Sequence, residues 1–131
     1  MVTFDTNVLI RILVGDDPAQ TRRAERLFRA HADGEGIYVP SIVLAEIAWV
    51  LSAGYGLDRT IVHERIGKLV RTRGVFVEDM ELTLQALTRY AAGGAELADH
   101  LILGKALERS ALPLYTFDRR LGREAHAQLV R

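Results

Sequence analysis

The chain has 131 residues, of which 49% are hydrophobic and 26% are charged, a composition typical of one soluble folded domain rather than a disordered segment. Its 17 Lys and Arg balance 17 Asp and Glu, and this net charge of zero excludes a uniformly basic nucleic-acid binder but allows a local basic patch. The absence of cysteine excludes disulfides, thiolate metal sites and a cysteine nucleophile.

The chain contains no stretch of the roughly 18 uncharged apolar residues that a membrane span requires. Its longest candidate, residues 42–53, is too short and is interrupted by Glu46. Residues 1–5 have no basic flank ahead of an apolar core, so a secretory signal is not expected. Together with the missing cysteines, these features lead us to expect a cytoplasmic protein.

Short runs of β-branched and aromatic residues alternate along the chain with longer patterns typical of helices. In chain order, the expected elements are a strand at 2–4, helices at 6–14 and 18–31, a strand at 37–39, helices at 42–53 and 58–71, a strand at 75–77, helices at 80–92 and 97–110, and strands at 114–116 and 128–130. This alternation predicts an α/β fold in which helices cover a mostly parallel sheet, as a single domain over residues 1–131.

Two aspartates follow expected strands. Asp5 comes after the strand at 2–4, and Asp118 comes after the strand at 114–116. Because ligands bind at the carboxyl ends of strands in open α/β sheets, these two carboxylates form a candidate cation site. Each of them is equally explained as the N-cap of a following helix, a position that favours Asp.

Glu46 is the only charged residue in the expected helix 42–53. A helix that is apolar on almost every side is usually buried, and a lone buried carboxylate is costly unless it is paired or binds a cation. We therefore expect a functional role for Glu46. The alternatives are an exposed stripe that carries Glu46 alone, or a structural salt bridge to an arginine.

Asp99 lies in the first turn of the expected helix 97–110, where a carboxylate also stabilises the helix macrodipole. Glu96 is either a second acid of the same site or a solvated neighbour. The histidines lack the spacing of metal ligands, and His100, which follows Asp99, is expected on the helix surface.

Acids at positions 5, 46, 99 and 118 repel one another in a shared site unless a divalent cation neutralises them. Oxygen ligands without cysteine or paired histidines favour Mg²⁺ or Mn²⁺ over zinc. The sequence therefore predicts a site for Mg²⁺ or Mn²⁺ built from these carboxylates.

The same residues carry a resemblance to a known family. The motifs resemble, in their order and approximate spacing, those of PIN-domain ribonucleases: Phe4-Asp5-Thr6-Asn7, Glu46 in the third helix, Ala98-Asp99 at the start of a late helix, and Thr116-Phe117-Asp118 after a strand. The likeness spans essentially the whole chain, and it is greatest to the VapC-type toxins of toxin–antitoxin pairs.

The resemblance implies a three-layer α/β/α sandwich and endonucleolytic cleavage of RNA that depends on Mg²⁺ or Mn²⁺. It also implies a homodimer and inhibition by a cognate antitoxin, which lays a peptide segment across the active-site groove. The family's catalytic and metal-binding acids carry over to Asp5, Glu46, Asp99 and Asp118. Asn7 and Thr116 match polar supporting positions, whereas acids at the position of Glu96 vary among relatives.

Basic residues are needed to attract an RNA strand to an acidic site. Of the 17 basic residues 15 are arginine, which grips phosphate through two donors. We expect RNA contact by at least one of Arg11, Arg119 and Arg120. Four further arginines lie on the expected helix 18–31, where they either contact RNA or form a solvated helical face. They are Arg22, Arg23, Arg26 and Arg29.

Trp49 has core-like helical spacing, so we expect it in packing or in a dimer contact. The apolar face of its helix extends beyond what one small domain covers, which favours oligomerisation.

Two other functions fit parts of the sequence. A receiver-like domain would accept a phosphoryl group on Asp79, but it needs an acidic pair that does not precede Asp5, and it leaves Glu46 without a role. A catalytically silent RNA- or protein-binding module would have lost one or more acids, whereas all four matched positions are filled here.

Overall fold

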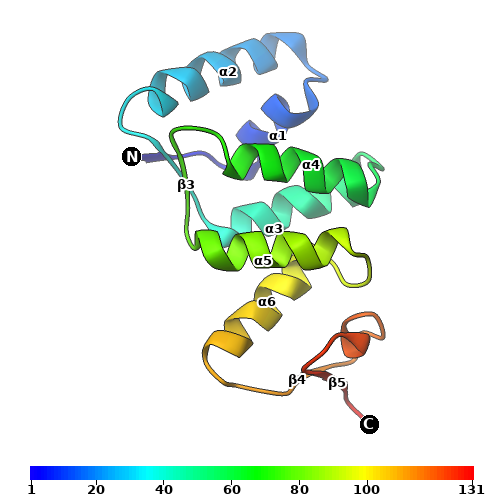
Figure 1. The fold of residues 1–131 in the computed structure, drawn as a ribbon. Helices are drawn as coiled ribbons and strands as arrows, with labels where there is room; N and C mark the ends of the chain where they lie inside the picture. Colours follow the sequence, from blue (N-terminus) through cyan, green and yellow to red (C-terminus); the bar gives the residue numbers. More distant parts are fainter. The chain divides into compact units, whose positions relative to one another are not determined.

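A computed structural model describes residues 1–131 (Figure 1). Its elements are β1 (Val2–Thr3), α1 (Thr6–Val14), α2 (Pro18–Ala32), β2 (Ile37–Val39), α3 (Ser41–Trp49), the π-helical η1 (Val50–Gly54), α4 (Arg59–Val70), β3 (Val75–Val77), α5 (Met80–Ala91), α6 (Leu97–Glu108), β4 (Leu114–Thr116), the 3₁₀-helical η2 (Leu121–Arg123) and β5 (Ala127–Leu129). The chain forms two compact units, Met1–Met80 and Glu81–Arg131, which we call the N-terminal and C-terminal units and describe separately.

The N-terminal unit is built on a three-stranded sheet in the order β1-β2-β3. Both strand pairs are parallel, with Ile37 opposite Val2 on one side and opposite Val75 on the other. The middle strand is the most buried, since Ile37 and Val39 have no exposed surface. Around the sheet, α2 contacts β2, α4 contacts β3, and α1 packs against both α2 and α3.

Capping side chains explain where the helices of this unit begin. The Asp17 carboxylate accepts a hydrogen bond from the Gln20 amide at 3.1 Å, and Pro18 occupies the first turn, where its missing N–H costs nothing. The Asp58 carboxylate caps α4 in the same way. Gly15 ends α1 in the left-handed conformation, at φ 71°, which favours glycine.

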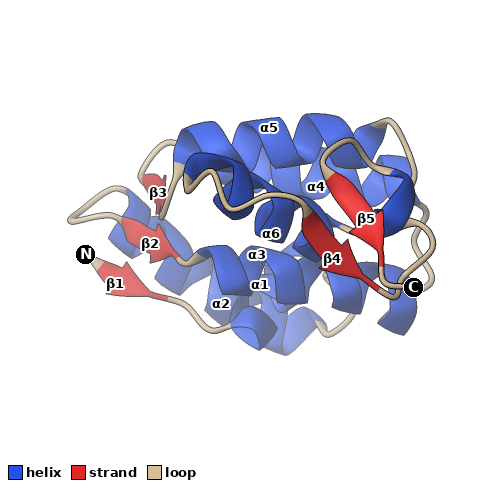
Figure 2. Cartoon of the chain, turned by 90° about the horizontal axis from the view of Figure 1, so that it is seen from below, coloured by secondary structure: helices blue, strands red, loops and turns tan.

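The C-terminal unit combines two helices with a parallel strand pair. Figure 2 shows β4 and β5 side by side, and Leu114 pairs with Ala127 in their register. Gly104 allows α6 to approach α5 closely, because a Cβ at that position would lie 2.9 Å from the Leu82 side chain. In both units all strand pairs are parallel, as the α/β prediction requires.

The prediction of one regular helix over residues 42–53 was wrong about the type of helix in its second half. The α-helix ends at Trp49, and a π-helical turn continues it to Gly54, in which the Tyr55 amide bonds the Val50 carbonyl at 3.0 Å. The Ser52 hydroxyl donates to the Ala48 carbonyl at 2.9 Å, a local bond that competes with regular helical pairing. Apolar periodicity carries no signal for this change of helix type.

His100 was expected on a helix surface, and this prediction was wrong. The side chain is fully buried on the same face of α6 as Leu97, Leu101 and Gly104. Its Nε2 lies 3.8 Å from the carboxylate of Glu124, which gives the imidazole a polar neighbour.

None of the helices in the structure is both long and apolar enough to cross a membrane.

Candidate functional site: two groups of carboxylates

In the N-terminal unit, a threonine hydroxyl connects two of the predicted acids. Asp5 follows β1 and caps α1, and its Oδ1 accepts a hydrogen bond from the Thr6 amide at 2.8 Å. The Thr6 hydroxyl donates to Oε1 of Glu46 at 2.9 Å. Thr6 itself is buried, whereas both carboxylates are exposed. The start of α1 and the middle of α3 therefore meet in one polar chain, Asp5–Thr6–Glu46.

The expected burial of Glu46 was wrong. Glu46 lies on an exposed stripe of α3 between Ile42, which is 70% exposed, and Trp49, which is 66% exposed. The opposite side of the helix supplies core residues such as Leu44 and Ile47. A helix with apolar residues on every side can therefore still leave one side exposed to solvent. Trp49 was expected in packing or in a dimer contact; its exposure excludes core packing, and the dimer contact stays a prediction.

The other predicted residues of this unit lie further along α1. Asn7 is exposed directly after Thr6. Arg11, one turn later, forms an ion pair of 3.2 Å with Asp16, whose other oxygen accepts a hydrogen bond from the Tyr55 hydroxyl at 3.1 Å.

In the C-terminal unit, Glu96 and Asp99 form a capping box at the start of α6. The Glu96 amide donates to Oδ2 of Asp99 at 3.1 Å, and the Glu96 side chain accepts from the amide of Asp99 in return. Oε1 of Glu96 also lies 3.4 Å from Nη1 of Arg120. Arg120 therefore links the start of α6 to the turn that follows β4.

Asp118 organises that turn. Its Oδ1 accepts hydrogen bonds from the amides of Arg120 at 2.7 Å and Leu121 at 3.1 Å, which sets the start of η2. The Asp118 amide in turn donates to the Thr116 hydroxyl at 2.9 Å, so the proton of that hydroxyl is still available as a donor. Arg119 is exposed beside this turn.

The four predicted acids share one property. Each is held through a single carboxylate oxygen by a protein donor, and its second oxygen has no protein hydrogen bond. None of the four forms an ion pair, although the chain contains 17 Lys and Arg. The residues concerned are Asp5, Glu46, Asp99 and Asp118. Such carboxylates are oriented yet keep their charge available for a cation.

The chain matches the PIN domain family over residues 2–126. The chain belongs to the PIN domain family. Membership confirms the expected three-layer α/β/α class with parallel strands, and PIN domains are generally nucleases, which are hydrolases. No curated protein matches the chain closely enough to add a more specific relationship.

The donor set of this PIN domain suits a hard divalent cation. All four acids offer oxygen atoms, and the Cys-free chain offers no thiolate that would favour zinc. The N-terminal unit contributes Asp5 and Glu46, and the C-terminal unit contributes Asp99 and Asp118. Within neither unit do three Asp, Glu or His side chains gather into a group that could hold a metal ion.

Thr6 is the residue of this PIN domain that the sequence analysis did not assign. It occupies the first helical position after a capping aspartate, which by itself is an ordinary place for threonine. The feature that reveals its role is structural: its hydroxyl is buried at the start of a helix, and a buried hydroxyl needs a hydrogen-bond partner. The partner, Glu46, lies 40 residues away and could not be found from local pattern.

Proposed function

We propose that this PIN domain is an endoribonuclease that hydrolyses RNA phosphodiester bonds with Mg²⁺ or Mn²⁺, and that residues 1–131 act as a single nuclease domain. The observation that supports this most directly is the set of four oriented carboxylates without ion pairs, at positions 5, 46, 99 and 118. A receiver-like function has no corresponding support from the family match.

The four acids would hold the cation, with Asp5 and Asp99 as principal ligands and Asp118 as a further ligand, direct or through water. A bound divalent cation supplies an activated water and neutralises charge on the scissile phosphate and the leaving oxygen. Glu46 would bind the cation or orient the attacking water, and Thr6 fixes the direction of its carboxylate.

Other polar residues would support the substrate. The Thr116 hydroxyl accepts a bond from the Asp118 amide and would use its own proton to hold the site or a phosphate oxygen. Asn7 would contact the site from the first turn of α1. Arg11, Arg119 and Arg120 would contact the RNA backbone, and Arg120 would exchange its present partner Glu96 for phosphate.

We further propose that the protein is the cytoplasmic toxin of a toxin–antitoxin pair, homodimeric and neutralised by a cognate antitoxin. The resemblance to VapC-type toxins supports this role. The exposed Ile42 and Trp49 on α3 supply apolar surface suited to a contact between two copies.

The test is cleavage of RNA by purified protein freed of antitoxin, with Mg²⁺ or Mn²⁺ and with EDTA as the metal-free comparison. Wild type should cleave only with the metal, and Asp5→Asn should lower the rate at least about 100-fold. Asp33→Asn is the matched control, because Asp33 is an exposed aspartate outside the proposed site. Equal cleavage by wild type and Asp5→Asn would show that the activity is contamination and that the site is wrongly assigned.

A further inference from the structure

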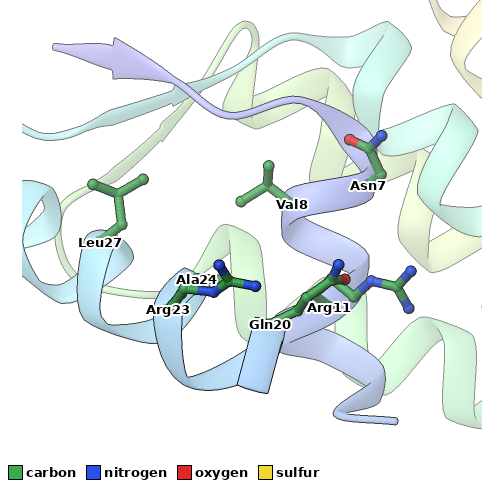
Figure 3. A pocket seen from close by; sticks show the side chains of 7 residues that line it. All are labelled: Asn7, Val8, Arg11, Gln20, Arg23, Ala24 and Leu27. Carbon is green, nitrogen blue, oxygen red and sulfur yellow. The ribbon is translucent and has the colours of Figure 1, made fainter. Parts of the chain in front are cut away.

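A pocket of about 450 Å³ lies between α1 and α2 of the N-terminal unit (Figure 3). Its apolar wall comes from Val8 on α1 and from Ala24 and Leu27 on α2. Polar side chains complete it, and these are Asn7, Arg11, Gln20 and Arg23. We call this hollow the α1–α2 pocket. It combines an apolar wall with two arginines, of which Arg11 is paired with Asp16 and Arg23 has no ion pair.

The positive charge of α2 has little local compensation. The helix carries four arginines and one acid, Glu25, although the chain as a whole has no net charge. Only Arg29 pairs with that acid, at 3.9 Å, whereas Arg23 and Arg26 form no ion pair. A second hollow of about 320 Å³ shares Arg23 and Leu27 with the pocket and is also bordered by Arg26. The basic surface therefore continues along the helix beyond the pocket.

One end of the α1–α2 pocket is formed by the same turn of α1 that carries Thr6. Asn7 lines the pocket and directly follows Thr6, whose hydroxyl binds Glu46. Arg11 lies about 6 Å further along α1, at about 1.5 Å per helical residue. The pocket therefore shares the first turn of α1 with the Asp5–Thr6–Glu46 chain and continues past Arg11.

We infer that the α1–α2 pocket binds one unpaired nucleotide of single-stranded RNA next to the bond that is cleaved. This inference rests on the proposed function. The base lies against the apolar wall formed by Val8 and Leu27, and a guanidinium stacks on its face or binds the adjacent phosphate. Arg26 continues the path of the backbone. Arg23 and Arg26 follow one another along α2 without an ion pair, and a ligand with repeated negative charges matches them better than a peptide with a single acidic residue does.

The test measures binding separately from cleavage. Asp5→Asn protein, in which cleavage should be at least about 100-fold slower, is titrated into a fluorescein-labelled single-stranded RNA of 10 to 12 nucleotides. Binding is followed by fluorescence anisotropy in EDTA at several salt concentrations. In this background, Arg23→Ala should weaken binding about fivefold to tenfold and reduce the salt slope by about 0.7, the value for one phosphate contact on a single strand. Leu27→Asp should weaken binding more than about tenfold, because it adds a like charge to the apolar wall.

Arg73→Ala is the matched control, since Arg73 is an exposed arginine of the same unit that lies outside the pocket. It should bind RNA like its parent. Leu27 is 48% exposed, so its substitution leaves the core intact, and circular dichroism verifies the fold of each variant. In a background that retains Asp5, Arg23→Ala should raise KM with little change in kcat.

Unchanged RNA binding by Arg23→Ala and Leu27→Asp would overturn the inference, as would an equal loss in Arg73→Ala. It would also be overturned if these variants kept RNA binding but lost a protein partner instead. If wild type fails to cleave RNA while the variants weaken binding as expected, the proposed function fails, and the pocket is assigned to RNA binding without a neighbouring cleavage site.

Discussion

In the N-terminal unit a buried threonine hydroxyl holds Glu46 from 40 residues away, whereas in the C-terminal unit Asp99 and Asp118 are held by backbone amides of their own turns. The first arrangement depends on the packing of α1 against α3, and the second forms within a few residues of each acid. A tertiary bond can be lost without unfolding a turn, while a cap cannot be lost without weakening the structure around it. Glu46 and the two acids of the C-terminal unit should therefore respond differently to conservative substitutions at the groups that hold them.

The largest effect is expected at Asp118, where capping and proposed chemistry can be separated. Asp118→Asn keeps an oxygen that accepts from the Arg120 and Leu121 amides, so stability should stay near wild type while RNA cleavage falls at least about 100-fold. Asp118→Ala removes the acceptor as well and should also lower the free energy of unfolding by about 1 kcal/mol. Urea denaturation and a cleavage assay measure the two quantities.

If Asp118→Asn cleaves RNA like wild type, Asp118 is only a cap. If Asp118→Ala unfolds at the same urea concentration as wild type, the hydrogen bonds to the turn contribute nothing to stability, and the contrast between the units weakens.

A smaller effect is expected at Thr6. Thr6→Val preserves the shape of the side chain but removes the donor to Glu46, so cleavage should fall about tenfold through a misdirected carboxylate. Thr6→Ser keeps the hydroxyl and should restore most of the rate. The pH profile of cleavage, measured for all three proteins, distinguishes a positioning role from a loss of folded protein.

Wild-type cleavage by Thr6→Val would show that Glu46 needs no support from α1. A loss shared equally by Thr6→Ser and Thr6→Val would assign the effect to packing at a buried position rather than to the hydrogen bond.

Local signals made much of the fold predictable. The strands at 37–39, 75–77 and 114–116 and the helix at 6–14 have the expected bounds, because short β-branched or aromatic runs mark the strands and Gly15 marks the end of the helix. Asp17-Pro18 likewise marks the start of α2. The last strand lies one residue earlier than expected, and η2 was not expected. The turn of η2 depends on a side-chain to backbone bond of Asp118, which composition does not reveal.

The site was predictable as a set of residue types but not as a set of contacts. The caps formed by Asp5, Asp99 and Asp118 follow from their places at element ends, and both readings of these acids, cap and candidate ligand, fit the same atoms. The exposure of Glu46 and the burial of His100 depend on which face of each helix the rest of the unit covers. That choice is tertiary and leaves no mark in a short window of sequence.

The smallest effect is expected at Glu35, an acid outside the proposed site whose support is entirely local, from its own backbone and from a side chain four residues earlier. A hydrogen bond from its own backbone amide lowers the pKa of Glu35 below its usual 4.5, and the His31 side chain, with Nδ1 at 2.5 Å, lowers it further. A lowered pKa in the folded state means that the ionised carboxylate stabilises the fold above about pH 4.5, and that this contribution is lost as the pH falls through the folded-state pKa. Glu35→Gln should therefore be slightly less stable than wild type at pH 7 and equally stable near pH 3. Urea denaturation across this range tests the sign, and a difference that grows toward low pH would contradict it.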